Sequence, residues 1–171
     1  PEPMMTRPLD VPFRARFTVL PAWLDPNGHM NVAYYLSAFD KGSDPFFEYC
    51  GLGWEYTKSG AGSVFATGCN LDFRHELLEG DELEVTTRLL DRNDKLLHLW
   101  CEVFRVGEST PAATEEALFM HVSLQTRRST PFPEFARARL DEVLAAHAVL
   151  PSPPTLGRKL EIRRGAGRPS S

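Results

Sequence analysis

Residues 29–49 carry the periodicity of a helix, while the segments on either side of them carry the two-residue alternation of strands. The apolar residues of this helix recur at steps of three and four, which places them on one face. They are Val32, Tyr35, Leu36 and Phe39. The helix is apolar on more than one side, so we expect a sheet to cover one face and a partner or a loop to cover another.

Proline and glycine residues set the expected limits of this helix. Pro45 lies inside it and removes one backbone hydrogen bond. It therefore predicts either a kink or a fresh helix start capped by Ser43 or Asp44. We expect the helix to begin at residue 29 or 30 and to end near Gly51 and Gly53.

Five segments have the alternating pattern of half-buried strands. They are residues 13–20, 63–73, 83–90, 95–106 and 114–127. The second is expected to place five side chains on one face, namely Phe65, Thr67, Cys69, Leu71 and Phe73. Gly68 in the same strand would let a ligand or another backbone come close. Residues 54–62 are expected to be an irregular connection, and residues 135–148 a short helix. Leu160 and Ile162 fit a further edge strand.

Three polar side chains stand at alternate positions just before the long helix. They belong to Asp25, Asn27 and His29, and the pair Asn27-Gly28 is a turn signal. The start of a helix offers unpaired N–H groups and a partial positive charge, which suit a bound carbonyl or a developing oxyanion. Each residue also has a purely structural interpretation. Asp25 would be a helix-capping or turn aspartate, Asn27 part of an ordinary Asn-Gly turn, and His29 a helix-start histidine bonded to a neighbouring carbonyl.

The pattern Asp-x-Asn-x-His-x-Asn at the head of an apolar helix resembles the active-site segment of hotdog-fold thioesterases. Residues 25–28 are similar to the Asp-Pro-x-Gly turn of the 4-hydroxybenzoyl-CoA thioesterase type, and the spacing of the three polar residues is similar to that of acyl-ACP thioesterases. Residues 70–85 resemble a strand, turn and strand of the same superfamily. Residues 25–53 also resemble betainyl-CoA thioesterases as well as they resemble generic acyl-CoA members.

The resemblance implies an α+β protein with the hotdog fold, in which a curled antiparallel sheet of five or six strands wraps around one long helix. We expect residues 1–12 to be a flexible lead-in and residues 13–148 to form the thioesterase domain. Residues 149–171 would be a C-terminal extension, disordered from about Gly165. Hotdog subunits dimerise with the active site shared across the interface, so a homodimer or a dimer of dimers is expected.

The resemblance also implies roles for the residues before the helix. Asp25 would attack the thioester carbonyl as a nucleophile or activate water as a base, and the sequence does not choose between these. The carbonyl would be held by the backbone N–H seven residues later, at Val32. Asn27 and His29 would orient Asp25, bind water or hydrogen-bond the substrate.

Further residues are assigned to substrate binding. The aromatic side chains of Trp23, Tyr35 and Phe39 are candidates for an acyl pocket, and an aromatic cage would suit a quaternary ammonium group. Thr67 and Gly68 are expected beside the substrate. Arg74 is a candidate partner for the phosphates of CoA. The resemblance thus implies hydrolysis of a small or medium acyl-CoA thioester to the free acid and CoA. The sequence does not decide which acyl group is cleaved, or whether the thiol is CoA or an acyl carrier protein.

Composition narrows the other classes of function. A net charge of −4 argues against nucleic acid as the main partner. No apolar run approaches the roughly 20 residues that span a bilayer, and no secretory signal opens the chain, so we expect a cytoplasmic protein with no membrane partner. Neither the three cysteines nor the five histidines have the spacing of a metal site, and no metal or other cofactor is predicted.

Two alternative functions remain. Hotdog enoyl-CoA hydratases also pair aspartate with histidine, but they carry one more residue between asparagine and histidine than the single Gly28 found here. A non-catalytic acyl-CoA-binding protein would keep the fold and lose the acidic group, whereas this chain keeps Asp25.

Overall fold

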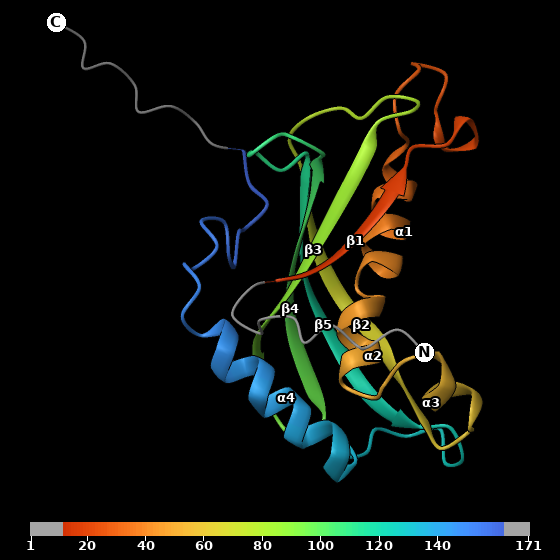
Figure 1. Ribbon diagram of the computed structural model, residues 1–171, viewed down its shortest axis with the longest axis vertical. Coiled ribbons are helices and arrows are strands. Elements are labelled where there is room, and N and C mark those ends of the chain that lie inside the picture. The colour runs from red at the N-terminus through yellow and green to blue at the C-terminus, as the bar shows by residue number, and fades with distance from the viewer. Residues whose placement is uncertain (1–11, 163–171) are drawn as a thin grey trace, which may run out of the picture.

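A five-stranded antiparallel sheet forms the frame of the molecule, seen in a computed structural model that describes residues 12–162 (Figure 1). The order across the sheet is β1-β3-β4-β5-β2, so β1 and β2 are its edges. The strands are β1 (Phe13–Thr18), β2 (Gly62–Phe73), β3 (Glu82–Arg92), β4 (Leu96–Arg105) and β5 (Ala113–Ser123). The sequence predicted all five strands, although it extended the last one to residue 127.

The helices lie between β1 and β2 in the chain, with one more after β5. Helix α1 packs along one face of the sheet, as the hotdog resemblance implies (Figure 1). The chain also forms a short 3₁₀ turn, Pro21–Trp23. The helices are α1 (Val32–Gly42), α2 (Asp44–Tyr49), α3 (Trp54–Lys58) and α4 (Glu134–His147). None of these described helices is long and apolar enough to cross a membrane.

The long helix expected over residues 29–49 is divided at Ser43. Pro45 stands in the first turn of α2, where its missing N–H costs nothing, so the fresh start is the alternative that the structure adopts. Ser43 occupies the N-cap position, but its hydroxyl does not cap α2; it donates to the carbonyl oxygen of Asp40 at 2.8 Å. Residues 54–58, expected to be irregular, form α3.

Strand β2 contains a bulge that the alternation of its sequence does not reveal. The pairing with β5 skips one residue between Ala66 and Gly68, so Thr67 is unpaired and the alternation of faces changes there. Leu71 and Val64 both pack against the core, Leu71 under α1 and Val64 against the cluster that contains Phe46 of α2. Phe65 follows Val64 directly and so points to the other face of the strand. The prediction that Phe65 shares a face with Leu71 is therefore wrong.

Helix α4 covers the part of β3 that β1 leaves unpaired. Strand β1 pairs only with Glu82–Thr87, so the next backbone groups of β3 would be an open edge. The Leu89 N–H instead donates to Nδ1 of buried His147 at 3.0 Å, and Leu140 and Val143 are fully buried beside it. The edge strand predicted at Leu160 and Ile162 is wrong, because both are exposed and outside any strand. The expectations for residues 1–11 and for the end from Gly165 lie outside the described residues.

Gly42 allows α1 to approach β3 closely. A Cβ atom on Gly42 would clash most closely with Cγ1 of Val85, which Val85→Ala removes, and would also stand 2.6 Å from the Cβ of Val85. We expect Gly42→Ala to lower the free energy of unfolding by about 2 kcal/mol, because overpacking outweighs the better helix propensity of alanine. Urea unfolding measures this loss. The double variant with Val85→Ala should lose less than the sum of the two single losses, and strict additivity would contradict the clash.

Candidate functional site

Residues 25–29 form a closed turn directly before α1. The Asp25 N–H donates to the carbonyl oxygen of His29 at 2.9 Å, and the Gly28 N–H donates to that of Asp25 at 2.9 Å. Gly28 has a φ of 79°, in the left-handed region that glycine adopts without strain. The Asn-Gly pair therefore makes the sharp bend that its sequence predicts.

The two oxygens of the Asp25 carboxylate have different surroundings. Oδ1 accepts from the N–H of Asn27 at 2.8 Å and from that of His29 at 3.4 Å, which holds the side chain against its own turn. Oδ2 has no hydrogen-bond or ion-pair partner within residues 12–162. One oxygen thus fixes the orientation of the carboxylate while the other has no partner in the described part of the chain.

The head of α1 presents an N–H group without an intrahelical acceptor. Asn31 is the N-cap: its Oδ1 accepts from Ala33 N–H at 3.0 Å, and its own N–H donates to the Trp23 carbonyl oxygen at 2.8 Å. Val32 is therefore the first helical residue, its N–H has no acceptor inside the helix, and its side chain is 59% exposed. The helix start expected at residue 29 or 30 is therefore wrong by two or three residues, and Asn31 before the apolar run is the cap signal in the sequence that marks the true start.

A second segment, the connection after β2, braces the turn. His29 Nε2 lies 2.9 Å from Oε2 of Glu76, and the Met30 N–H donates to the Leu77 carbonyl oxygen at 2.7 Å. His29 also forms a β-bridge with Leu78. The two sequence segments that carry the family resemblance therefore meet here. Glu76 was not among the predicted residues, because no spacing rule connects it to His29.

The predicted polar residues meet Asp25 through their backbones. Within the described part of the chain, neither the amide of Asn27 nor the ring of His29 contacts the Asp25 carboxylate; both residues donate their N–H groups to it. Of the roles considered for these side chains, orienting Asp25 is thus performed by main-chain groups. Contact with water or substrate remains a prediction for both.

The predicted aromatic residues have structural contacts. Trp23 stacks on Tyr34 with ring centroids 5.7 Å apart. Tyr35 is buried, and its hydroxyl donates to the His75 carbonyl oxygen at 3.2 Å; burial raises its pKa. Phe39 lies in the core with none of its side chain exposed. These contacts explain the rings as packing, and their predicted role in binding an acyl group stays a prediction.

The remaining predicted residues lie on or after β2. Thr67, at the bulge, donates its hydroxyl to the Leu118 carbonyl oxygen at 3.2 Å, and a Cβ on Gly68 would meet no atom within 4 Å. The guanidinium of Arg74 is already bound, to Asp72 Oδ2 at 3.3 Å and to Thr155 Oγ1 at 3.3 Å. A phosphate would have to compete with Asp72 for Arg74.

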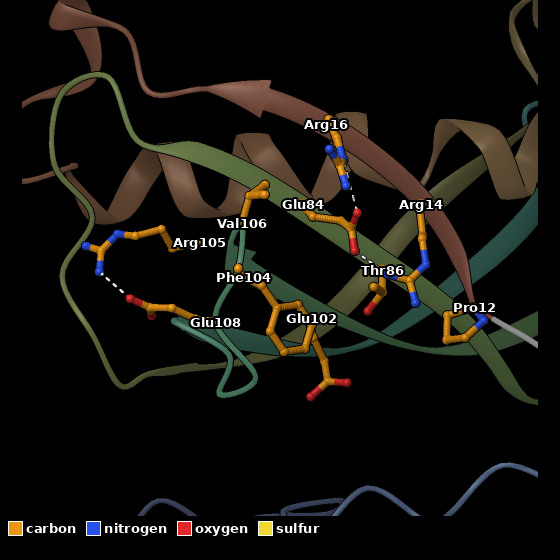
Figure 2. A pocket seen from close by; sticks show the side chains of 11 residues that line it. Pro12, Arg14, Arg16, Glu84, Thr86, Glu102, Phe104, Arg105, Val106 and Glu108 are labelled. Atoms are coloured by element: carbon orange, nitrogen blue, oxygen red, sulfur yellow. Dashed lines mark hydrogen bonds and ion pairs between the residues drawn. The ribbon is translucent and has the colours of Figure 1, made fainter.

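A cavity of about 320 Å³ opens on the face of the sheet away from α1, and Figure 2 shows it. It holds three arginines, but each is paired: Arg14 and Arg16 with Glu84, and Arg105 with Glu108. No residue predicted for the site lines this cavity. Its positive charges are neutralised, so it offers no ready place for phosphates.

Thiols and possible metal ligands are the other reactive side chains among the described residues. Burial raises the pKa of Cys50 to about 12 and also raises those of Cys69 and Cys101, so all three stay protonated at neutral pH. Across residues 12–162 no three His, Cys, Asp or Glu side chains are grouped to hold a metal ion.

Comparison with known proteins agrees with the geometry. The family model of the thioesterase-like superfamily matches residues 19–140. The betainyl-CoA thioesterase of Pseudomonas aeruginosa is 37% identical over 144 residues, which is 84% of this chain and 91% of that protein.

Two solved structures share the fold and were determined with CoA bound. One is a hypothetical protein of Staphylococcus aureus in complex with CoA, with a TM-score of 0.82 and 28% identity over 89% of this chain and 96% of that one. The other is a thioesterase of Thermus thermophilus complexed with CoA and Zn, with a TM-score of 0.66 and 26% identity over 80% of this chain and 96% of that one. The chain therefore has the hotdog fold and belongs to the thioesterase-like superfamily, whose members it joins as an enzyme that hydrolyses thioesters.

Proposed function

We propose that this thioesterase hydrolyses a small acyl-CoA to the free acid and CoA at the turn before α1, and that betainyl-CoA is its preferred substrate. The observation that carries the proposal is the pairing of a carboxylate oxygen without a partner, Asp25 Oδ2, with the unpaired N–H of Val32 at the head of the same helix. A thioester needs both a group that delivers the attack and a group that polarises the carbonyl.

The two groups divide the chemistry between them. The Val32 N–H would donate to the carbonyl oxygen and stabilise the oxyanion that forms when the carbonyl carbon is attacked, helped by the positive end of α1. Asp25 would either form an anhydride with the acyl group or take a proton from the attacking water. Both routes release CoA and end with a free acid.

His29 is proposed to have a smaller role than Asp25, as a contact for the substrate or for water. Its Nε2 is held by Glu76, and 42% of its side chain is exposed, so the ring can reach a substrate or a water molecule while its orientation stays fixed. Asn27 is exposed beside it and would supply a further hydrogen bond.

The relatives support the proposed substrate. The relative that is 37% identical across most of both chains is a betainyl-CoA thioesterase, and two structures of the same fold hold CoA. We therefore propose CoA rather than a carrier protein as the thiol. No nucleic-acid or membrane partner is proposed, and the cytoplasmic location remains a prediction.

A homodimer is proposed as the active form. β2 is an edge strand whose central residues, 65–70, are all exposed, and an open edge of this length invites pairing with another strand. Large apolar side chains are also exposed on α1 and along β2. They are Val32, Leu36, Phe65 and Phe73. A second copy paired through β2 would cover both, and a dimer of dimers would extend this arrangement.

The test is a substrate panel followed by free-thiol release. We expect betainyl-CoA to give a kcat/KM at least about tenfold above those of acetyl-CoA, benzoyl-CoA and a betainyl carrier protein, since substrates that lack the favoured contacts lose transition-state binding. Crotonyl-CoA separates the hydratase alternative, because hydration removes the enoyl absorbance without releasing thiol. Loss of that absorbance with no thiol release from any member of the panel would contradict the proposed reaction.

A further inference from the structure

A second cavity, of about 200 Å³, lies where α1 ends and α2 begins, above β2 and β5. We call it the α1/α2 cavity. It is lined by the carboxylates of Asp40 and Asp44 and by three aromatic rings, those of Phe47, Trp54 and Phe119. No lysine or arginine is among its lining residues. Figure 1 shows α2 following α1 directly, with α3 beside α2.

The two carboxylates of the α1/α2 cavity have no ion-pair partner among the described residues, although Lys41 lies near enough to act on Asp44. Burial and the neighbouring carboxylates of Asp40 and Glu48 raise the pKa of Asp44, an effect that a bound cation would reverse. The Trp54 side chain is 63% exposed, which is unusual for tryptophan.

Carboxylates together with aromatic faces are the groups that recognise a quaternary ammonium ion. Such an ion has no N–H to donate, so a protein binds it by its charge and by the electron-rich faces of aromatic rings. A neutral acyl chain would gain nothing from the two carboxylates, and an anionic one would be repelled. The lining of the cavity therefore fits an organic cation better than a neutral or an anionic acyl chain.

The cavity and the reacting groups of one chain stand at opposite ends of α1. Its 11 residues span about 16 Å, whereas one methylene separates the ammonium from the carbonyl in a betainyl group. In the proposed dimer, the β2 strands of the two subunits pair antiparallel, centred near Gly68. This pairing brings the Phe73 end of one β2 beside the Ser63 end of the partner's.

This antiparallel pairing joins the two halves of a site. Tyr35, in the first turn of α1, has its ring 5.2 Å from that of Phe73, while Ser63 lines the α1/α2 cavity. The cavity of one subunit therefore comes next to the head of α1 in the other. We propose that the α1/α2 cavity binds the quaternary ammonium group of the acyl chain whose thioester is cleaved by Asp25 of the partner subunit. The inference rests on the thioesterase function and the dimer proposed above.

The first test compares two substrates of one shape. Betainyl-CoA and 3,3-dimethylbutanoyl-CoA differ by nitrogen against carbon, and so by one positive charge. In Asp40→Asn, Asp44→Asn and Trp54→Leu, we expect the ratio of their kcat/KM values, betainyl over neutral, to fall on the order of 10- to 100-fold, through a higher KM for betainyl-CoA. Glu55→Gln, which removes an exposed carboxylate on α3 outside the cavity, should keep the ratio of the wild type.

The outcomes separate the two proposals. A wild-type enzyme that cleaves both esters with equal kcat/KM, or three cavity variants that keep the wild-type ratio, would overturn the cation site and leave the thioesterase standing. A wild-type enzyme that releases thiol from neither ester would overturn the proposed function as well. Circular dichroism of each variant confirms that it is folded, and three separate substitutions prevent one misfolded variant from deciding the result.

Mixed dimers test the crossing between subunits. Asp25→Asn removes the reacting carboxylate, and the double variant Asp40→Asn, Asp44→Asn removes the cation site, so each alone should cleave betainyl-CoA poorly. When equal amounts are unfolded and refolded together, half of the dimers are mixed, and each has one site with both defects and one with neither. We expect about a quarter of the wild-type activity to return. No recovery in verified mixed dimers would overturn a site shared between subunits.

Discussion

Asp25→Asn is expected to lower kcat for betainyl-CoA by a factor on the order of 100 or more, with little change in KM. Asparagine retains an Oδ1 that can accept from the N–H groups of Asn27 and His29, so the turn should survive. The unpartnered Oδ2 is replaced by an amide that neither attacks a carbonyl nor accepts a proton from water. Free-thiol release at saturating substrate measures the loss.

His29→Ala is the matched comparison for this variant. It removes the ring bound to Glu76 but leaves the carboxylate and its two N–H donors in place, so we expect a smaller loss of kcat, about tenfold. Circular dichroism and thermal unfolding show whether each variant is folded. An Asp25→Asn enzyme as active as the wild type would remove Asp25 from the chemistry and leave it as a turn residue.

Glu115→Gln is expected to stabilise the protein at neutral and alkaline pH. Glu115 lies on β5 beneath α1 with only 5% of its surface exposed, and burial, followed by the nearby Asp40 carboxylate, raises its pKa from 4.5 to about 7. The folded state therefore binds more protons than the unfolded state between these values. The contribution of Glu115 to stability is greatest below pH 4.5 and falls as the pH rises through 7, by about 3 kcal/mol.

The glutamine variant cannot titrate, so its free energy of unfolding should lack this fall. Urea unfolding of both proteins between pH 5 and 8 measures the difference. Asp40→Asn provides a second check, because removal of that carboxylate should move the midpoint of the fall to lower pH in a chain that keeps Glu115. Equal pH dependence in the wild type and in Glu115→Gln would contradict the assignment of a buried, protonated Glu115.

The fold followed from local patterns that lie within a few residues of one another. Strand alternation predicted five strands close to their observed positions, and Pro45 predicted either a kink or a fresh helix start, of which the structure adopts the second. The bulge at Thr67 was not predictable in this way, because it depends on the pairing with β5, which no local pattern in β2 contains. The early helix start was an error of another kind, since Asn31 carries a cap signal in the sequence.

The candidate site also has one part that adjacent residues predict and another part that depends on distant segments of the chain. Asp25, Gly28 and Val32 belong to one turn and one helix start, so their arrangement follows from a few adjacent residues. Glu76 meets His29 only because the connection after β2 folds back on the turn, and 47 residues separate the two in sequence. The α1/α2 cavity is assembled from the three helices α1, α2 and α3 and the strands β2 and β5, and no motif in the sequence predicts it.

The structure of the Asp25→Asn variant with intact betainyl-CoA bound tests the central claim most directly, because the slow variant leaves the thioester uncleaved. We expect the thioester carbonyl oxygen about 3 Å from the Val32 nitrogen, with the side chain at position 25 facing the carbonyl carbon. A carbonyl oxygen bound elsewhere, with the Val32 N–H facing solvent, would contradict the account.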